Sequence, residues 1–92
     1  MPTPPPSIIA SASRGSIDTH KRELVMVLAD GDRVIYDERR ALLIRRSEHA
    51  PAYNETPLLP GIAPDVVDFM ADVYRRAARL LRHRRRAAVR FA

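Results

Sequence analysis

The stretch ELVMVLADGDRVIY, residues 23–36, decides the fold class of this sequence. Leu24 to Leu28 form an apolar run rich in β-branched residues, and Asp30-Gly31 is a dipeptide favoured in two-residue hairpin turns. Val34 to Tyr36 would supply the returning strand, so the stretch predicts a β-hairpin. The alternative is a helix from Thr19 to Asp30 that ends at Gly31, which would make the protein all-α.

The segment that follows, DERRALLIRRSEHA, residues 37–50, predicts a short helix. Asp37 is a suitable N-cap, and Arg45 and Arg46 fall near the C-terminus, as the helix dipole prefers. Pro51 would prevent continuation. A third strand over Ala41 to Ile44 is the alternative.

The segment before the hairpin, MPTPPPSIIASASRGSID, residues 1–18, predicts a flexible arm. Its proline run cannot enter a helix or a central strand and favours an extended conformation. A segment of this composition is often a tail without a role. The functional alternative is an arm that threads across a neighbouring subunit, with Ile8 and Ile9 as its anchor.

The C-terminal segment predicts one long amphipathic helix over residues 64–90. Pro64 suits the first helical turn, Asp65 complements the helix dipole, and no proline or glycine follows. We therefore expect an α+β protein with a single small domain over residues 19–92. Its parts would be a hairpin, a short helix and a long C-terminal helix of roughly 40 Å, at 1.5 Å per residue.

Four apolar residues of this helix are candidates for an interface. Three of them recur every seven residues, and the fourth lies between the first two, as in a coiled-coil heptad. Two heptads are too few to establish a coiled coil, and such a stripe is more often ordinary core. A homodimer seam is the alternative. The candidates are Val67, Met70, Tyr74 and Leu81.

The charge of the chain is unevenly distributed. The net charge is +5, yet residues 1–72 hold all 11 acidic residues beside eight basic ones, and residues 73–92 hold eight arginines and no acid. In a helix, the run Arg82-His83-Arg84-Arg85-Arg86 would point charge around the whole circumference, which is unfavourable unless an anion neutralises it. The candidate anion-binding residues are Arg75, Arg76, Arg79, Arg82, Arg84, Arg85, Arg86 and Arg90.

Nucleic acid is the first candidate partner, because guanidinium groups bind phosphate. The sequence has no pattern typical of a base-reading domain, so we expect non-specific contacts to the phosphate backbone. The alternative is a structural or adaptor subunit of a larger assembly, such as a virion, in which the arm and the helix dock and the arginines meet an acidic protein surface. A membrane surface fits less well, because Arg84 to Arg86 interrupt the apolar face that it requires.

Composition and motifs favour a non-enzymatic protein without cofactor or metal. Cysteine is absent, which excludes disulfides and thiolate metal sites, and the three histidines are scattered. The glycines are isolated, so no phosphate-cradling loop is present. The sequence shows neither a membrane-spanning stretch nor a secretory signal at its N-terminus, so we expect a cytoplasmic location, or alternatively a nuclear or virion one.

Overall fold

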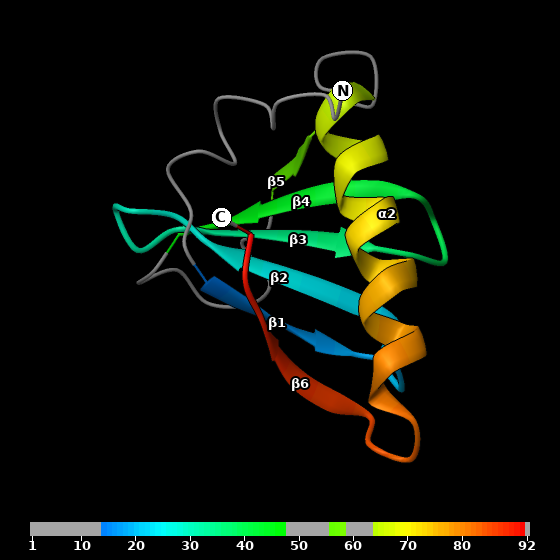
Figure 1. Ribbon diagram of the computed structural model, residues 1–92. Coiled ribbons are helices and arrows are strands. Elements are labelled where there is room, and N and C mark those ends of the chain that lie inside the picture. Colours follow the sequence, from blue (N-terminus) through cyan, green and yellow to red (C-terminus); the bar gives the residue numbers. More distant parts are fainter. Residues whose placement is uncertain (1–13, 48–55, 59–63, 92) are drawn as a thin grey trace, which may run out of the picture.

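The computed structural model describes residues 14–47, 56–58 and 64–91. Their strands form one antiparallel sheet of six strands in the order β5-β4-β3-β2-β1-β6, and the 18-residue helix α2 lies across one face of it (Figure 1). The α+β class is therefore confirmed, and the all-α alternative is wrong. The elements are β1 (Arg14–Asp18), β2 (Glu23–Val27), β3 (Arg33–Asp37), β4 (Leu42–Arg46), β5 (Thr56–Leu58), α2 (Pro64–Leu81) and β6 (Arg86–Val89).

The predicted hairpin is confirmed as β2 and β3, but its turn is longer than expected. Leu28 and Asp32 extend the pairing, with a backbone N–H···O bond of 2.8 Å from Leu28 to Asp32. Three residues, 29–31, therefore form the loop, and its glycine, Gly31, has φ 93°. A three-residue loop with a left-handed third position is a common alternative to the two-residue turn, and glycine adopts that conformation without strain.

The predicted helix over residues 37–50 is wrong, because its described part is a turn followed by β4, which pairs with β3. The alternative, a strand over Ala41 to Ile44, is confirmed as a strand, although its bounds are Leu42–Arg46. Asp37 does act as a cap: its Oδ1 accepts hydrogen bonds from the backbone N–H groups of Arg39 and Arg40, at 3.0 and 3.3 Å. The cap closes only a four-residue turn, since Ala41 enters the left-handed region with φ 51° and redirects the chain into a strand.

The β1–β2 turn repeats this design. Asp18 Oδ1 accepts the backbone N–H groups of His20 and Lys21, at 2.9 and 3.1 Å, and Arg22 takes the left-handed position with φ 57°. The two turns also contact each other, because Glu38 donates its backbone N–H to the Arg22 carbonyl at 3.0 Å and its side chain forms an ion pair with the Arg22 guanidinium.

The predicted N-terminal arm, residues 1–18, overlaps β1. Residues 14–18 are a strand hydrogen-bonded between β2 and β6, and Ile17 is 1% exposed. Residues 1–13 of the predicted arm lie outside the described residues. The core domain therefore includes at least five residues that the sequence pattern assigned to the arm.

The long helix begins at Pro64 as predicted but ends at Leu81, so the prediction of a helix to residue 90 is wrong. Arg82 has φ 55°, the Arg84 N–H bonds to the Leu81 carbonyl at 3.0 Å, and the chain returns as β6 along β1. Consecutive like charges on neighbouring helical turns repel. The sheet offers the segment an alternative that satisfies its backbone.

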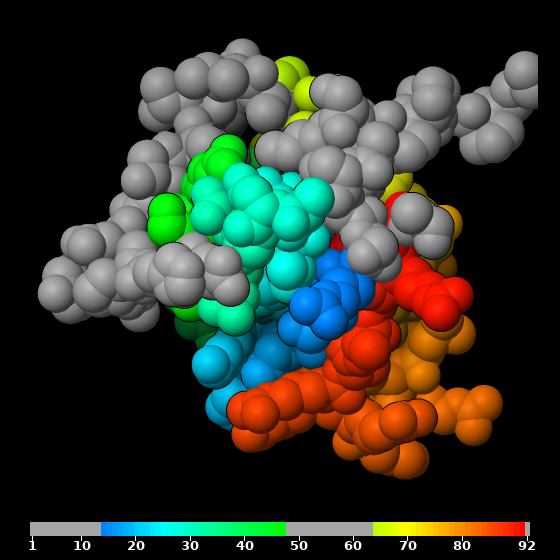
Figure 2. Space-filling model, turned by 90° about the vertical axis from the view of Figure 1, so that its left-hand side faces the viewer, coloured from blue at the N-terminus to red at the C-terminus, as the bar shows by residue number. Residues whose placement is uncertain are grey.

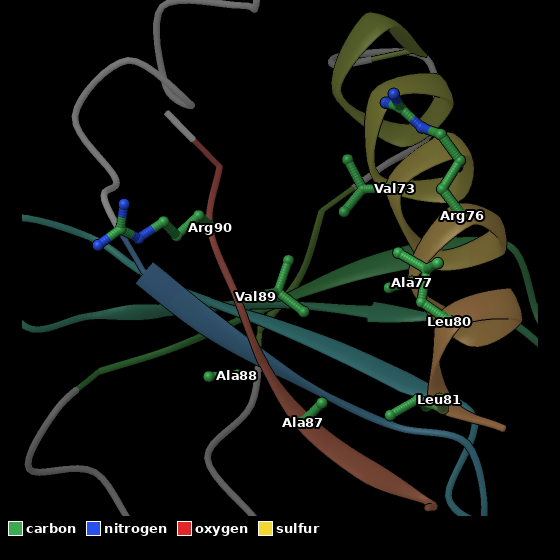
Figure 3. Close-up of a pocket in the computed structure, with 9 residues that line it drawn as sticks. All are labelled: Val73, Arg76, Ala77, Leu80, Leu81, Ala87, Ala88, Val89 and Arg90. Carbon is green, nitrogen blue, oxygen red and sulfur yellow. The ribbon is translucent and has the colours of Figure 1, made fainter. Parts of the chain in front are cut away.

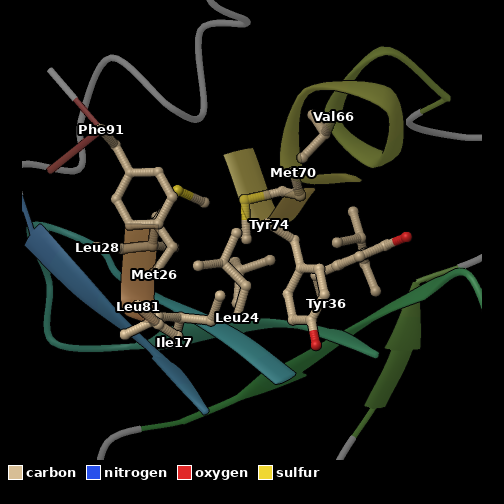
Figure 4. Packing of buried hydrophobic residues seen from close by; sticks show 12 residues of the cluster. Ile17, Leu24, Met26, Leu28, Tyr36, Val66, Met70, Tyr74, Leu81 and Phe91 are labelled. Carbon is tan, nitrogen blue, oxygen red and sulfur yellow. The ribbon is translucent and has the colours of Figure 1, made fainter. Parts of the chain in front are cut away.

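The core lies between α2 and the sheet (Figure 4). Strand alternation points every second residue toward the helix, which is why Leu24 and Met26 are fully buried while Val25 and Val27 are half-buried on the opposite face. From α2 come Val66, Met70, Tyr74 and Leu81, and from the sheet and its flanks come Ile17, Leu24, Met26, Leu28, Val34, Tyr36, Leu43 and Phe91.

Phe91 fixes the C-terminal strand to this core. Its ring lies over Gly15, where a Cβ atom would come within 2.4 Å of the ring, and 7% of the residue is exposed. β6 is thus held by its pairing with β1 and by an aromatic side chain beyond its end.

Candidate functional site

The eight predicted anion-binding arginines do not lie on one helix. Three of them occupy the exposed side of α2, three follow in the α2–β6 turn, one opens β6 and one follows it. All eight are exposed. In this order they are Arg75, Arg76, Arg79, Arg82, Arg84, Arg85, Arg86 and Arg90.

Three of the eight have carboxylate partners. On the surface of α2, Asp72 forms ion pairs with Arg76 at 2.7 Å and with Arg75 at 3.8 Å. At the start of β6, Arg86 Nε lies 3.0 Å from Asp18 Oδ2. Because these guanidinium groups are more than half exposed, each pair contributes only about 0–1 kcal/mol to stability. The pairs nevertheless reduce the charge that these arginines offer to a partner.

The other arginines have no carboxylate partner within the described segments. Four of them, Arg79, Arg82, Arg84 and Arg85, lie in the last turn of α2 and the loop after it, and we call this group the basic turn. The negative end of the helix dipole accounts for one or two cations there. In Figure 2 the α2–β6 turn, in orange, lies at the lower edge of the molecule.

The basic turn is anchored through its backbone. The Arg85 carbonyl accepts hydrogen bonds from the Thr19 backbone N–H at 2.8 Å and from the Thr19 hydroxyl at 3.3 Å. The Arg86–Asp18 ion pair follows directly. The turn therefore has a fixed backbone, while its guanidinium groups extend into solvent.

The pKa of the Asp18 carboxyl group, which pairs with Arg86, is lowered. The Lys21 backbone N–H lowers the pKa of Asp18 most; burial opposes it, and the Arg86 guanidinium and the His20 N–H lower the pKa further. Asp18 is therefore charged near neutral pH, where it caps the β1–β2 turn and its ion pair with Arg86 joins that turn to the start of β6. Tyr36 and Tyr74, which meet edge to face at 6.3 Å in the core, have their pKa raised by burial.

The predicted interface residues lie mainly inside the chain's own core. Met70, Tyr74 and Leu81 are at most 8% exposed, and Val67 packs against the same cluster. These side chains contact the sheet. The large apolar residue that α2 does expose is Leu80, at 82%.

An open groove lies between α2 and β6, with a volume of about 430 Å³ (Figure 3). Its walls are apolar, and Arg76 and Arg90 are also among its lining residues. The sequence pattern does not indicate the groove, because it places residues 82–90 on the helix. In the structure every second side chain of residues 86–91 is exposed, as in an edge strand, but the sequence of this segment, rich in Arg and Ala, favours a helix locally. The apolar walls are formed by Val73, Ala77, Leu80, Leu81, Ala87 and Val89.

Other kinds of site find little support in the described segments. Histidine, aspartate and glutamate residues there form no group of three that could hold a metal ion. No helix within them has the length and apolar character needed to cross a membrane. The absence of enzymatic activity and of a cofactor stays a prediction.

Comparison with known proteins gives no relative: no family model, no curated protein and no solved structure matches this chain.

Proposed function

We propose that this protein binds the phosphate backbone of nucleic acids non-specifically through the basic turn. The observation that carries the proposal is that Arg79, Arg82, Arg84 and Arg85 are exposed and have no carboxylate partner within the described segments. Guanidinium groups on a fixed loop can contact successive phosphates and release condensed counterions. Because α2 ends at Leu81, residues 82–86 do not form a helix that is basic all round.

The aromatic residues favour phosphate contact over base stacking. Proteins that bind single strands usually stack bases on exposed aromatic rings. Within the described segments Tyr36, Tyr74 and Phe91 are buried and Phe69 is half-buried, so no Phe or Tyr ring is presented beside the basic turn, and the exposed ring there is the smaller imidazole of His83. We therefore expect little preference for sequence.

The test is the salt dependence of binding to a short DNA duplex. Changing the four arginines of the basic turn to Gln should reduce the steepness of the slope of log affinity against log salt by up to about 3.6, because each phosphate contact contributes about 0.9. The same positions changed to Lys should retain most of the binding, since a non-specific contact needs charge more than a bidentate fork.

A charge-matched control separates the basic turn from net charge. Four exposed cations elsewhere, changed to Gln, remove the same charge and should leave most of the slope. An equal loss in this control would contradict the assignment to the turn, and absence of salt-dependent binding by the wild-type protein at about 50 mM salt would contradict the function. The control residues are Arg14, Arg33, Arg39 and Arg40.

A further inference from the structure

β6 is an edge strand with outward-facing backbone groups. It pairs with β1 alone among the described strands. The bond from the Thr19 N–H to the Arg85 carbonyl fixes the alternation of this antiparallel pair, so residues 87 and 89 bond to β1. The N–H and C=O groups of Arg86 and Ala88 therefore point away from the sheet. Such an edge can accept another strand.

The groove lies directly beside this edge. Ala87 and Val89 point toward α2, whereas Ala88 and Arg90 point away from it (Figure 3). A strand added to β6 would continue the same alternation. Its inward side chains would lie next to Ala87 and Val89 and meet Leu80 on the helix, so these side chains should be apolar.

The arginines on and after β6 indicate which kind of chain could bind at this edge. The outward side chains of an added strand would lie beside Arg86, which also pairs with Asp18, and beside Arg90, which has no carboxylate partner within the described segments. Acidic residues are therefore favoured there, most strongly next to Arg90. A second copy of β6 would place like charges opposite each other, which disfavours self-pairing. Residues 1–13 of the same chain have no acidic side chain and four prolines, so they lack both the charge and several N–H groups.

From these observations we infer that β6 and the groove bind an extended segment of a partner protein, in which acidic and apolar residues alternate. The segment adds to the sheet as a seventh strand: its backbone pairs with Arg86 and Ala88, its apolar side chains fill the groove, and its carboxylates face Arg86 and Arg90. This is strand addition, in which the backbone supplies affinity and alternate side chains supply specificity. It uses residues other than the basic turn and is independent of the proposed function.

The probe is a labelled, end-capped peptide of alternating Glu and Val, with a Lys and Val peptide as its charge-reversed control. We expect the wild-type protein to bind the Glu peptide and not the Lys peptide in fluorescence anisotropy. Equal binding of both peptides, or binding of neither up to about 1 mM, a very weak affinity, would overturn the proposal.

Ala88→Pro is the decisive variant, because it removes an outward N–H that β1 does not use, and proline is tolerated on edge strands. It should weaken binding of the Glu peptide about tenfold or more while the unfolding midpoint stays near that of wild type. Leu80→Ser, which alters a side chain that is 82% exposed, should also weaken binding. Arg39→Gln, a change in the distant β3–β4 turn, should leave it unchanged.

The remaining outcomes decide against an acidic segment of a partner protein. Undiminished peptide binding by Ala88→Pro, in a protein that still folds, would overturn strand addition. A wild-type dimer that this substitution dissociates would assign the edge to a second copy. Loss of duplex DNA binding in Ala88→Pro, with no peptide binding by wild type, would assign the edge to nucleic acid.

Discussion

The α2–β6 turn shares a backbone feature with the β1–β2 and β3–β4 turns and differs from them in charge. Each has one non-glycine residue in the left-handed region, namely Arg22, Ala41 and Arg82. In the first two turns an aspartate accepts two backbone N–H groups. The third has no carboxylate of its own and is held by backbone bonds and by the docking of β6.

The difference separates two uses of arginine in one small domain. Where a carboxylate caps the turn, arginines such as Arg22 and Arg40 pair with acidic side chains and support the local structure. In the α2–β6 turn backbone hydrogen bonds and the pairing of β6 hold the chain in place, and the guanidinium groups are exposed. The excess positive charge of the C-terminal segment is thus displayed on a turn whose fold does not need it.

The largest effect should come from removing the residue that secures the third turn from a distance. Phe91→Ala removes a ring that is 7% exposed and covers Gly15, so it should cost about 3–5 kcal/mol of unfolding free energy. Denaturant unfolding measures this cost. Because β6 would detach first, the variant should also lose protection of the Thr19 amide, which bonds to Arg85. A cost below about 1 kcal/mol would show that β6 is held by its strand pairing alone.

A smaller effect should distinguish the acid-capped turns from the third turn as pH falls. The pKa of Asp18 is lowered, most strongly by the Lys21 N–H. For Asp37 burial is the largest single effect and raises the pKa, but the hydrogen bonds and charge of Arg40 and the Arg39 N–H together outweigh it, so the pKa is lowered. A carboxyl with a lower pKa in the folded state stabilises the fold above its unfolded pKa, about 3.9, and this stabilisation disappears as pH falls through the folded pKa.

Unfolding free energy measured between about pH 6 and pH 2 should therefore fall less in the double variant Asp18→Asn, Asp37→Asn than in wild type. The variant starts from a lower stability at neutral pH, since the amide is a weaker acceptor than the carboxylate. Parallel pH profiles for the two proteins would show that the caps do not contribute through their charge.

The sequence predicts the fold where the determining interactions are local, as in the β2–β3 hairpin and at the Pro64 start of α2. It fails at Asp37, because an aspartate before a short apolar run caps a hairpin turn as well as it caps a helix. It also fails for β1, whose residues 14–18 include one buried apolar side chain, Ile17, and depend on neighbours on both sides.

The candidate site was predictable in composition and not in geometry. Arginine and alanine favour helix locally, so residues 82–90 continue the α2 pattern until pairing with β1, about 70 residues earlier in the chain, is considered. That pairing creates the groove and the outward edge of β6. It also gives Arg86 a carboxylate, Asp18, which no local pattern indicates.

The smallest effect should come from relieving backbone strain at the three left-handed positions. An L-residue in this region costs about 1–2 kcal/mol, and the greater unfolded-state entropy of glycine offsets part of the gain on substitution. Ala41→Gly changes little else, so it should stabilise the fold by up to about 1 kcal/mol in denaturant unfolding. Arg79→Gly, within a regular helical turn, is the control and should cost about 1 kcal/mol.

The same substitution at the other two positions tests the comparison itself. Arg22→Gly relieves the same strain but loses the ion pair with Glu38, so it should gain less than Ala41→Gly. Arg82→Gly relieves strain and also removes a charge from a turn with three other arginines and no carboxylate, so it should gain at least as much. If Arg82→Gly gained the least stability of the three variants, the charge of Arg82 would be stabilising in the folded protein. The basic turn would then have a partner within the protein, in place of the proposed nucleic acid.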